Sequence, residues 1–220
     1  MKPLVLFLLL LFLVPCLKAQ DKEYLYEIGG GVGTSWAYGD INRSSAVYNP
    51  GLAFDLIWRY NLNLRWALAL DVSASKLQGD SHDFDNAFPD GQHLTFDSRL
   101  WQLAFRPEIT FWNYGFGSDY REKHRLAPFL TMGVGFGMAR NASLTIPMGL
   151  GMKWKMSPRW NAQLTCLFTK VMNDATDRID DPYGMGTTMP MNTDWIGSLT
   201  LSLTFDFKER CVECHNQNSF

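Results

Sequence analysis

This sequence of 220 residues has few long apolar stretches and no large excess of positive or negative charge. After the first twenty residues, no apolar run approaches the roughly 20 residues that a membrane-spanning helix needs. A protein that crosses a membrane with several helices is therefore excluded. The formal net charge is −2, so no basic excess points to a nucleic-acid partner.

The one apolar run lies at the start, in "MKPLVLFLLLLFLVPCLKAQ". A single Lys, a short apolar core and a small residue at Ala19 are typical of a secretory signal peptide. We expect residues 1–19 to be this signal and the exported chain to begin near Gln20. The alternative is a lipoprotein signal that uses Cys16, although Pro15 occupies the place of the usual small residue.

From Tyr24 onward, large apolar residues fall on every second position, with Gly, Ala, Ser and scattered charges between them. A period of two predicts β-strands. Strands of soluble sandwiches average five or six residues, whereas most of these runs have about ten residues or more, the length that a tilted strand needs to cross a bilayer. Eight such runs occur, at 24–38, 51–60, 66–73, 101–111, 130–138, 146–154, 160–168 and 195–207.

The pattern predicts an all-β protein, an eight-stranded antiparallel transmembrane β-barrel of the outer-membrane type, over residues 20–207. Both ends would lie in the periplasm, with residues 208–220 as a periplasmic tail. The large faces then meet outer-membrane lipid, and aromatic residues gather at the two interfaces. The periplasmic rim would hold Tyr24, Tyr26, Trp58, Tyr60, Trp66, Phe111, Trp112, Trp154, Trp160, Phe205 and Phe207, and the outer rim Trp36, Tyr38, Trp101, Phe168 and Trp195.

The same threading assigns the connections. Turns at 61–63 and 156–159 are short and periplasmic, and the long outer connections span 74–98 and 170–193. The periplasmic segment 112–125 is longer than usual, which marks it as a contact surface for a partner.

Charged residues on the strand faces that carry small side chains are predicted to point into the barrel. Eight strands leave an interior just wide enough for side chains, and charges removed from water must be paired. We interpret the nearly balanced set, with Glu27 beside it, as a salt-bridged plug; a proton or ion path is the alternative. The plug comprises Asp55, Arg59, Asp71, Arg106, Glu108, Lys153 and Asp206.

Catalytic and metal-binding signals are weak. A barrel enzyme acting on lipid or protein at the outer rim needs a nucleophile beside a base, and only His82 and His93 would serve there. The acidic loop "NDATDRIDDPYG" carries carboxylates that calcium would accept, but without the spacing of a known calcium loop. We expect no cofactor, no metal and no small-molecule substrate.

The tail contains "CVECH", which matches the attachment motif of a c-type haem. A haem must also be enclosed and given a second axial ligand, and zinc needs more ligands than His215 adds. In an oxidising compartment, a Cys211–Cys214 loop or a disulfide to another protein fits better. Cys166 is assigned to the lipid face, away from the tail.

Several stretches together resemble the PorG-like outer-membrane barrels of the type IX secretion and gliding machinery of Bacteroidetes. They are "YLYEIGGGVGTSWAYGDIN", "RYNLNLRWALALDVSASKLQGD", "LAPFLTMGVGFG" and "IPMGLGMKWKMSPRWN" followed by "DRIDDPYG". The resemblance implies a non-catalytic subunit that associates, in the periplasm, with the ring of the lipoprotein PorK and its partner PorN. It also implies that Cys211 and Cys214 are available for a link to that ring.

Overall fold

A computed structural model of the chain describes residues 23–38, 49–80, 95–116, 123–139, 142–172 and 195–210. Nine strands lie in these ranges, and no helix among them is long and apolar enough to cross a membrane. The strands are β1 Tyr24–Tyr38, β2 Gly51–Asn61, β3 Trp66–Asp80, β4 Thr95–Thr110, β5 Leu126–Met132, β6 Val134–Met138, β7 Ala142–Lys155, β8 Trp160–Val171 and β9 Trp195–Glu209.

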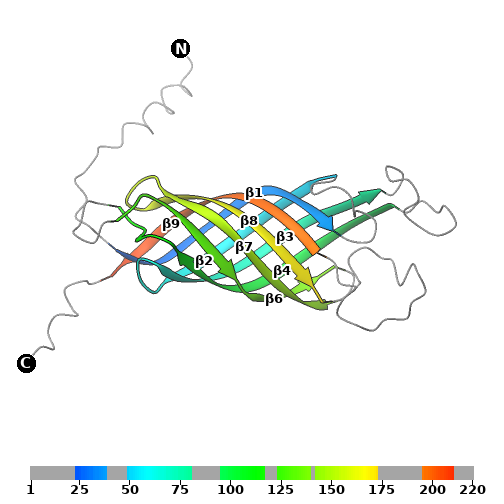
Figure 1. Ribbon diagram of the computed structural model, residues 1–220, viewed down its shortest axis with the longest axis horizontal. Helices are drawn as coiled ribbons and strands as arrows, with labels where there is room; N and C mark the ends of the chain where they lie inside the picture. The colour runs from blue at the N-terminus through cyan, green and yellow to red at the C-terminus, as the bar shows by residue number, and fades with distance from the viewer. Residues whose placement is uncertain are drawn as a thin grey trace, which may run out of the picture.

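The strands form a closed antiparallel ring (Figure 1). Apart from β5 and β6, which do not pair with each other, each strand pairs with its neighbours in the chain, and β9 closes the ring on β1 through a register that runs from Tyr24↔Glu209 to Tyr38↔Trp195. β5 and β6 follow one another in a single position, since both pair with β4 on one side and β7 on the other. The predicted antiparallel β-barrel is confirmed.

The split of the fifth run into β5 and β6 at Gly133 was not expected. The Gly133 amide donates to the carbonyl of Pro147 at 2.8 Å. A Cβ at Gly133 would lie 2.1 Å from the carbonyl oxygen of Phe105 and 2.7 Å from Cγ of Arg106. Glycine is therefore required here, because the backbone of β4 at Phe105 and Arg106 leaves no space for a side chain at this break.

The two ends of the barrel differ. The terminal end carries Tyr24 and Glu209 together with the turns at 62–65 and 156–159 and the described residues 111–116 and 123–125; the opposite end, which we call the loop end, carries the pairs Tyr38↔Trp195 and Asp80↔Thr95. The first described strand therefore begins, and the last one ends, at the terminal end. At the loop end, β3 ends at Asp80 and β4 begins at Thr95. Both strands therefore extend into the segment 74–98 that was predicted as a connection. β9 likewise runs two residues past the predicted end of the barrel at 207.

The exterior of the barrel is apolar. On β2 the exposed residues alternate with buried ones, and the exposed ones are Leu52, Phe54, Leu56 and Trp58. At the terminal end, the Tyr26 ring stacks with Trp58 and Phe207, with centroids 5.8 and 5.5 Å apart. A soluble protein would bury such a surface, so this exterior is suited to lipid.

Two aromatic residues assigned to the girdles are buried, and the prediction that they face lipid is wrong. Trp36 is 7% exposed, and its ring lies across Gly197 of β9, where a Cβ would come within 2.2 Å of ring atoms. Tyr24 is 8% exposed, and its hydroxyl accepts a hydrogen bond from Nε of Arg159 at 3.2 Å. Alternation predicts which side of the strand a residue faces. It does not predict whether a neighbouring strand or turn covers that residue.

Candidate functional site

The interior of the barrel is filled with polar side chains in the terminal half and in the middle. All seven residues predicted for the lumen are buried on the inner face. They come from five different strands: Asp55 and Arg59 from β2, Asp71 from β3, Arg106 and Glu108 from β4, Lys153 from β7 and Asp206 from β9.

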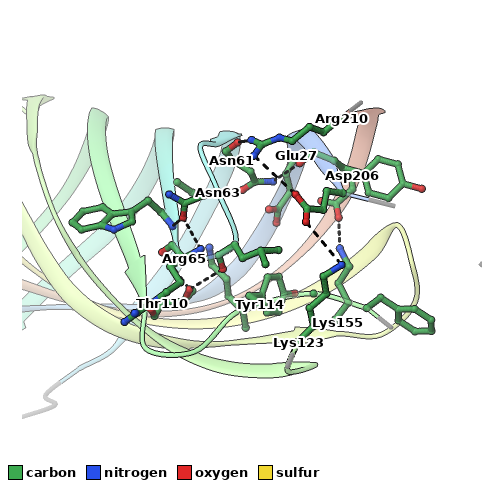
Figure 2. A pocket seen from close by; sticks show the side chains of 18 residues that line it. Glu27, Asn61, Asn63, Arg65, Thr110, Tyr114, Lys123, Lys155, Asp206 and Arg210 are labelled. Atoms are coloured by element: carbon green, nitrogen blue, oxygen red, sulfur yellow. Dashed lines mark hydrogen bonds and ion pairs between the residues drawn. The ribbon is translucent and has the colours of Figure 1, made fainter. Parts of the chain in front are cut away.

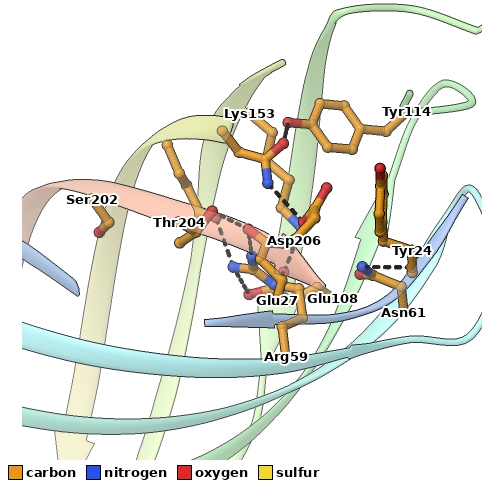
Figure 3. Close-up of polar contacts among 12 residues, drawn as sticks. Tyr24, Glu27, Arg59, Asn61, Glu108, Tyr114, Lys153, Ser202, Thr204 and Asp206 are labelled. Atoms are coloured by element: carbon orange, nitrogen blue, oxygen red, sulfur yellow. Dashed lines mark hydrogen bonds and ion pairs between the residues drawn. The ribbon is translucent and has the colours of Figure 1, made fainter. Parts of the chain in front are cut away.

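Arg59 is the centre of an ionic network in the terminal half, defined here as Glu27, Arg59, Glu108, Lys153 and Gln163 (Figure 3). The fully buried guanidinium forms ion pairs with Glu27 and, at 2.8 Å, with Glu108, and it donates to Oε1 of Gln163 at 2.6 Å. Lys153 Nζ lies 2.6 Å from Glu108. Three of these contacts link strands that are not neighbours in the ring, β2 with β4, β2 with β8 and β7 with β4, so they hold the barrel together through its interior.

A second cluster closes the network toward the terminal end. Lys155 forms an ion pair with Asp206, and Asn161 donates to Asp206 at 2.9 Å. The hydroxyl of Tyr114, from the segment 111–125, enters the barrel and donates to Oδ1 of Asn161 at 2.9 Å. Burial, and then the nearby carboxylates of Glu27 and Asp206, raise the pKa of Tyr114 above its usual value, so the hydroxyl remains a donor.

A chamber lies in the middle of the barrel, around Asp55, Asp71 and Arg106. Arg106 Nη2 is 3.3 Å from Asp71, and the Ser202 hydroxyl is 3.2 Å from both carboxylate oxygens of Asp55. Gly31 leaves room for this pair, since a Cβ there would lie 2.4 Å from the Ser202 oxygen. Among the described groups, Arg106 Nε and Nη1 have no hydrogen-bond partner. Hydroxyl side chains line half of the remaining wall: Ser73, Ser75, Thr165, Thr169, Ser198 and Thr200.

An apolar cluster fills the interior at the loop end. It consists of Ala37, Leu77, Leu100, Val171 and Ile196, all at most 7% exposed. Ionic and apolar side chains thus occupy the two ends of the described interior, and this arrangement disfavours an open path for ions or solutes.

Sequence reasoning missed two members of the interior. Lys155 has the same parity as Lys153 and directly precedes the turn at 156–159, so continuing the alternation by one step would have found it. Tyr114 lies outside any alternating run, and no local signal places its side chain. Its position depends on backbone hydrogen bonds from Tyr114 to Leu64 at 2.9 Å and from Gly115 to His124 at 3.1 Å.

A recess opens at the terminal end, bounded by β1, the turn after β2, residues 114–116 with Lys123, and the ends of β7 and β9 (Figure 2). We call it the terminal recess. Five cationic side chains and three carboxylates line it: Arg65, Lys123, Lys153, Lys155 and Arg210 with Glu23, Glu27 and Asp206.

Other predicted residues fall outside the described ranges. They are the signal segment 1–19, His82 and His93, the acidic loop, and the tail cysteines Cys211 and Cys214. Cys166 lies on β8, partly exposed, as a free thiol. Within the described residues, no three His, Cys, Asp or Glu side chains converge in a way that would hold a metal ion.

Comparison with known families matches residues 2–216 to a family described as "Domain of unknown function (DUF6089)". The chain belongs to this family. No curated protein sequence matches.

Among solved structures, the chain is similar to Neisserial surface protein A, with 11% identity, 83% of this chain and 97% of that chain covered, and a TM-score of 0.54. Outer membrane protein OprG from Pseudomonas aeruginosa has 11% identity, coverages of 85% and 97%, and a TM-score of 0.48. Ail of Yersinia pestis has 13% identity, coverages of 84% and 99%, and a TM-score of 0.47. The likeness to Neisserial surface protein A concerns the fold, which is that of outer-membrane β-barrels.

Proposed function

We propose that this DUF6089 chain is a non-catalytic, integral outer-membrane subunit that anchors the periplasmic ring of a type IX secretion machine. The observation that carries the proposal is the combination of an apolar exterior with a filled interior. The machine and its ring proteins, PorK and PorN, come from the resemblance to PorG-like barrels.

The exterior supports insertion into the outer membrane. The strands other than β5 and β6 have 11 to 16 residues each. A tilted strand needs about 9–11 residues to cross a bilayer. Exposed apolar residues alternate along them, as on β2. Transfer of these side chains from water to lipid provides the driving force for insertion.

The interior supports a structural role. Arg59 and Lys153 both contact Glu108 in the cross-section of the barrel, at 2.8 and 2.6 Å, and Leu77 and Leu100 are packed at the other end. A barrel filled in this way does not conduct solutes, which favours a function located at its ends.

The terminal end has the features of an attachment site. It carries the outer ends of the first and last strands at Tyr24 and Glu209, the recess, and residues 111–116, which are tied to the turn after β2 by the hydrogen bond from Tyr114 to Leu64. If the termini lie in the periplasm, this end faces the ring. In the sequence, Cys211 directly follows Arg210 and Cys214 lies three residues further on; both are outside the described residues.

Affinity purification from detergent-extracted outer membranes tests the proposal. Tagged chain is expected to recover PorK and PorN, and non-reducing gels are expected to show a covalent adduct that disappears in Cys211→Ser or Cys214→Ser variants. Cys166→Ser, on the barrel wall, is the matched control and keeps the adduct. Recovery of neither ring protein by a folded barrel, shown by its heat-dependent mobility on gels, contradicts the proposal.

A further inference from the structure

We propose that the chamber around Asp55, Asp71 and Arg106 is a binding site for one or two buried water molecules, held by the free edge of Arg106 and by Asp55. The site lies in the middle of the barrel, and it depends neither on the anchoring role nor on the ring proteins. The groups that form it are buried polar atoms that the surrounding protein does not satisfy.

Arg106 supplies the donors of the site. It is 1% exposed and lines the chamber. Its Nη2 lies 3.3 Å from Asp71, but its Nε and Nη1 are buried and have no hydrogen-bond partner among the described groups. In Arg59, by contrast, Nε lies 2.8 Å from Glu108 and Nη1 forms an ion pair with Glu27. Buried donors without a partner cost stability, so the edge of Arg106 calls for an acceptor in the chamber.

Asp55 supplies acceptors on the opposite side of the site. It is 8% exposed, and the Ser202 hydroxyl donates to it from 3.2 Å. A hydroxyl carries a single proton, so most of the acceptor capacity of the carboxylate is left unused. In the described part of the chain, no cationic group forms an ion pair with Asp55. This carboxylate therefore calls for further donors.

The strand register brings these groups to one cavity. Ser73 of β3 lies opposite Asp55 of β2 and opposite Gln102 of β4. Arg106 lies four residues beyond Gln102 on the same inner face of β4, and all four residues line the chamber. The chamber leaves about 20 Å³ for the centres of water-sized molecules, and roughly 10–15 Å³ suffices for one water. One or two waters fit, whereas an organic ligand does not.

Water satisfies this wall better than an ion does. A water molecule accepts from Arg106 and donates to Asp55, and the hydroxyl groups of the wall both donate and accept. An anion at the guanidinium would face the carboxylate of Asp55, and a cation at the carboxylate would face the guanidinium. Leu100 and Ile196 of the apolar cluster border the chamber toward the loop end, so the water is held inside a barrel whose filling disfavours an open path.

A crystal structure of the full chain, grown from detergent and at a resolution that shows ordered water, tests the site directly. We expect one or two peaks of density within hydrogen-bond distance of Arg106 Nε or Nη1, with Asp55 or wall hydroxyls as further partners. The guanidinium of Arg59 is the matched control in the same map, and no water is expected at its Nε. Crystals with bromide for chloride and rubidium for sodium test for ions, because both scatter anomalously. No peak at Arg106, or an anomalous peak there, overturns the proposal.

Urea unfolding in lipid vesicles gives a second test. Ser73→Val extends the side chain into the chamber, whereas Ser73→Ala removes the same hydroxyl without filling it. Displaced water leaves the Arg106 donors unsatisfied, so we expect the folding equilibrium constant of the valine variant to be about tenfold below that of the alanine variant, which corresponds to about 1.4 kcal/mol. A dry chamber would gain packing from valine. A valine variant as stable as the alanine variant, or more stable, therefore overturns the proposal.

Arg106→Met is the background that separates lost water from crowding. Without the guanidinium, the displaced water leaves no unsatisfied donor there, so the difference between Ser73→Val and Ser73→Ala should largely disappear. A difference that persists in full in this background would show that valine is simply too large for the wall, and it contradicts a water site at Arg106.

Discussion

The two halves of the barrel interior are filled in different ways. In the terminal half, the Arg59 guanidinium contacts two carboxylates and an amide oxygen from three strands. It forms an ion pair with Glu27, lies 2.8 Å from Glu108 and donates to Gln163 at 2.6 Å. Toward the loop end, the equally buried Arg106 has one carboxylate, Asp71, at 3.3 Å, beside a chamber of hydroxyl groups. Beyond the chamber, the filling is apolar.

The difference teaches that burial alone does not define the role of a charge. Arg59 connects β2 with β1, β4 and β8, so its contacts cross the ring. Arg106 and Asp71 lie on adjacent strands, β4 and β3, whose register is already set by their backbone pairing. The first arginine holds the barrel cross-section together, and the second completes a local pair.

The largest effect is expected for Arg59→Met. The change leaves Glu27 and Glu108 facing each other without their common cation, and breaking a buried pair in this way costs about 4 kcal/mol. Urea unfolding in lipid vesicles, followed by tryptophan fluorescence, measures the loss. Arg159→Met, at a rim position whose side chain is 52% exposed, should change the free energy of unfolding by less than about 1 kcal/mol. Equal stability of the two variants would contradict a central role for Arg59.

Much of this organisation could be predicted from the sequence. The period of two assigns Arg59, Glu108 and Lys153 to the inner face because side chains alternate strictly along a strand. Alternation also places large residues such as Leu56 outside. It does not say which inward charges meet, because the pairs depend on how strands far apart in sequence are staggered around the ring.

What the sequence could not predict lies where the strand pattern stops. Tyr114 reaches the interior from a connection, through backbone hydrogen bonds that no periodicity signals. The break at Gly133 appears in the sequence as one more small residue, and only the structure shows how closely the backbone of β4 at Phe105 approaches it. Trp36 has the outward parity of a girdle residue, but Gly197 opposite gives its ring a place to lie flat.

Leu77→Ala tests the apolar end of the comparison. Leu77 is 0% exposed within the cluster at the loop end, and removal of a buried leucine side chain costs about 3 kcal/mol through lost burial and the cavity that remains. The matched control is Leu56→Ala, which is 66% exposed on the outer face and leaves no internal cavity. Unfolding in the same vesicles should show the larger loss for Leu77, and a larger loss for Leu56 would mean that the cluster does not seal the loop end.

The smallest of the three effects is expected for Arg106→Met. The variant loses one long ion pair and two donors that have no partner among the described groups, and it leaves Asp71 beside a chamber lined with hydroxyls. We expect a loss of about 2 kcal/mol, within the range for a buried group that loses its partner. The double variant Arg106→Met with Asp71→Asn should recover most of this loss, because removing both charges of a pair is nearly neutral. For Arg59 no single second substitution should do so, since two carboxylates face it; a full recovery there, or a loss for Arg106→Met as large as for Arg59→Met, would remove the distinction between the two halves.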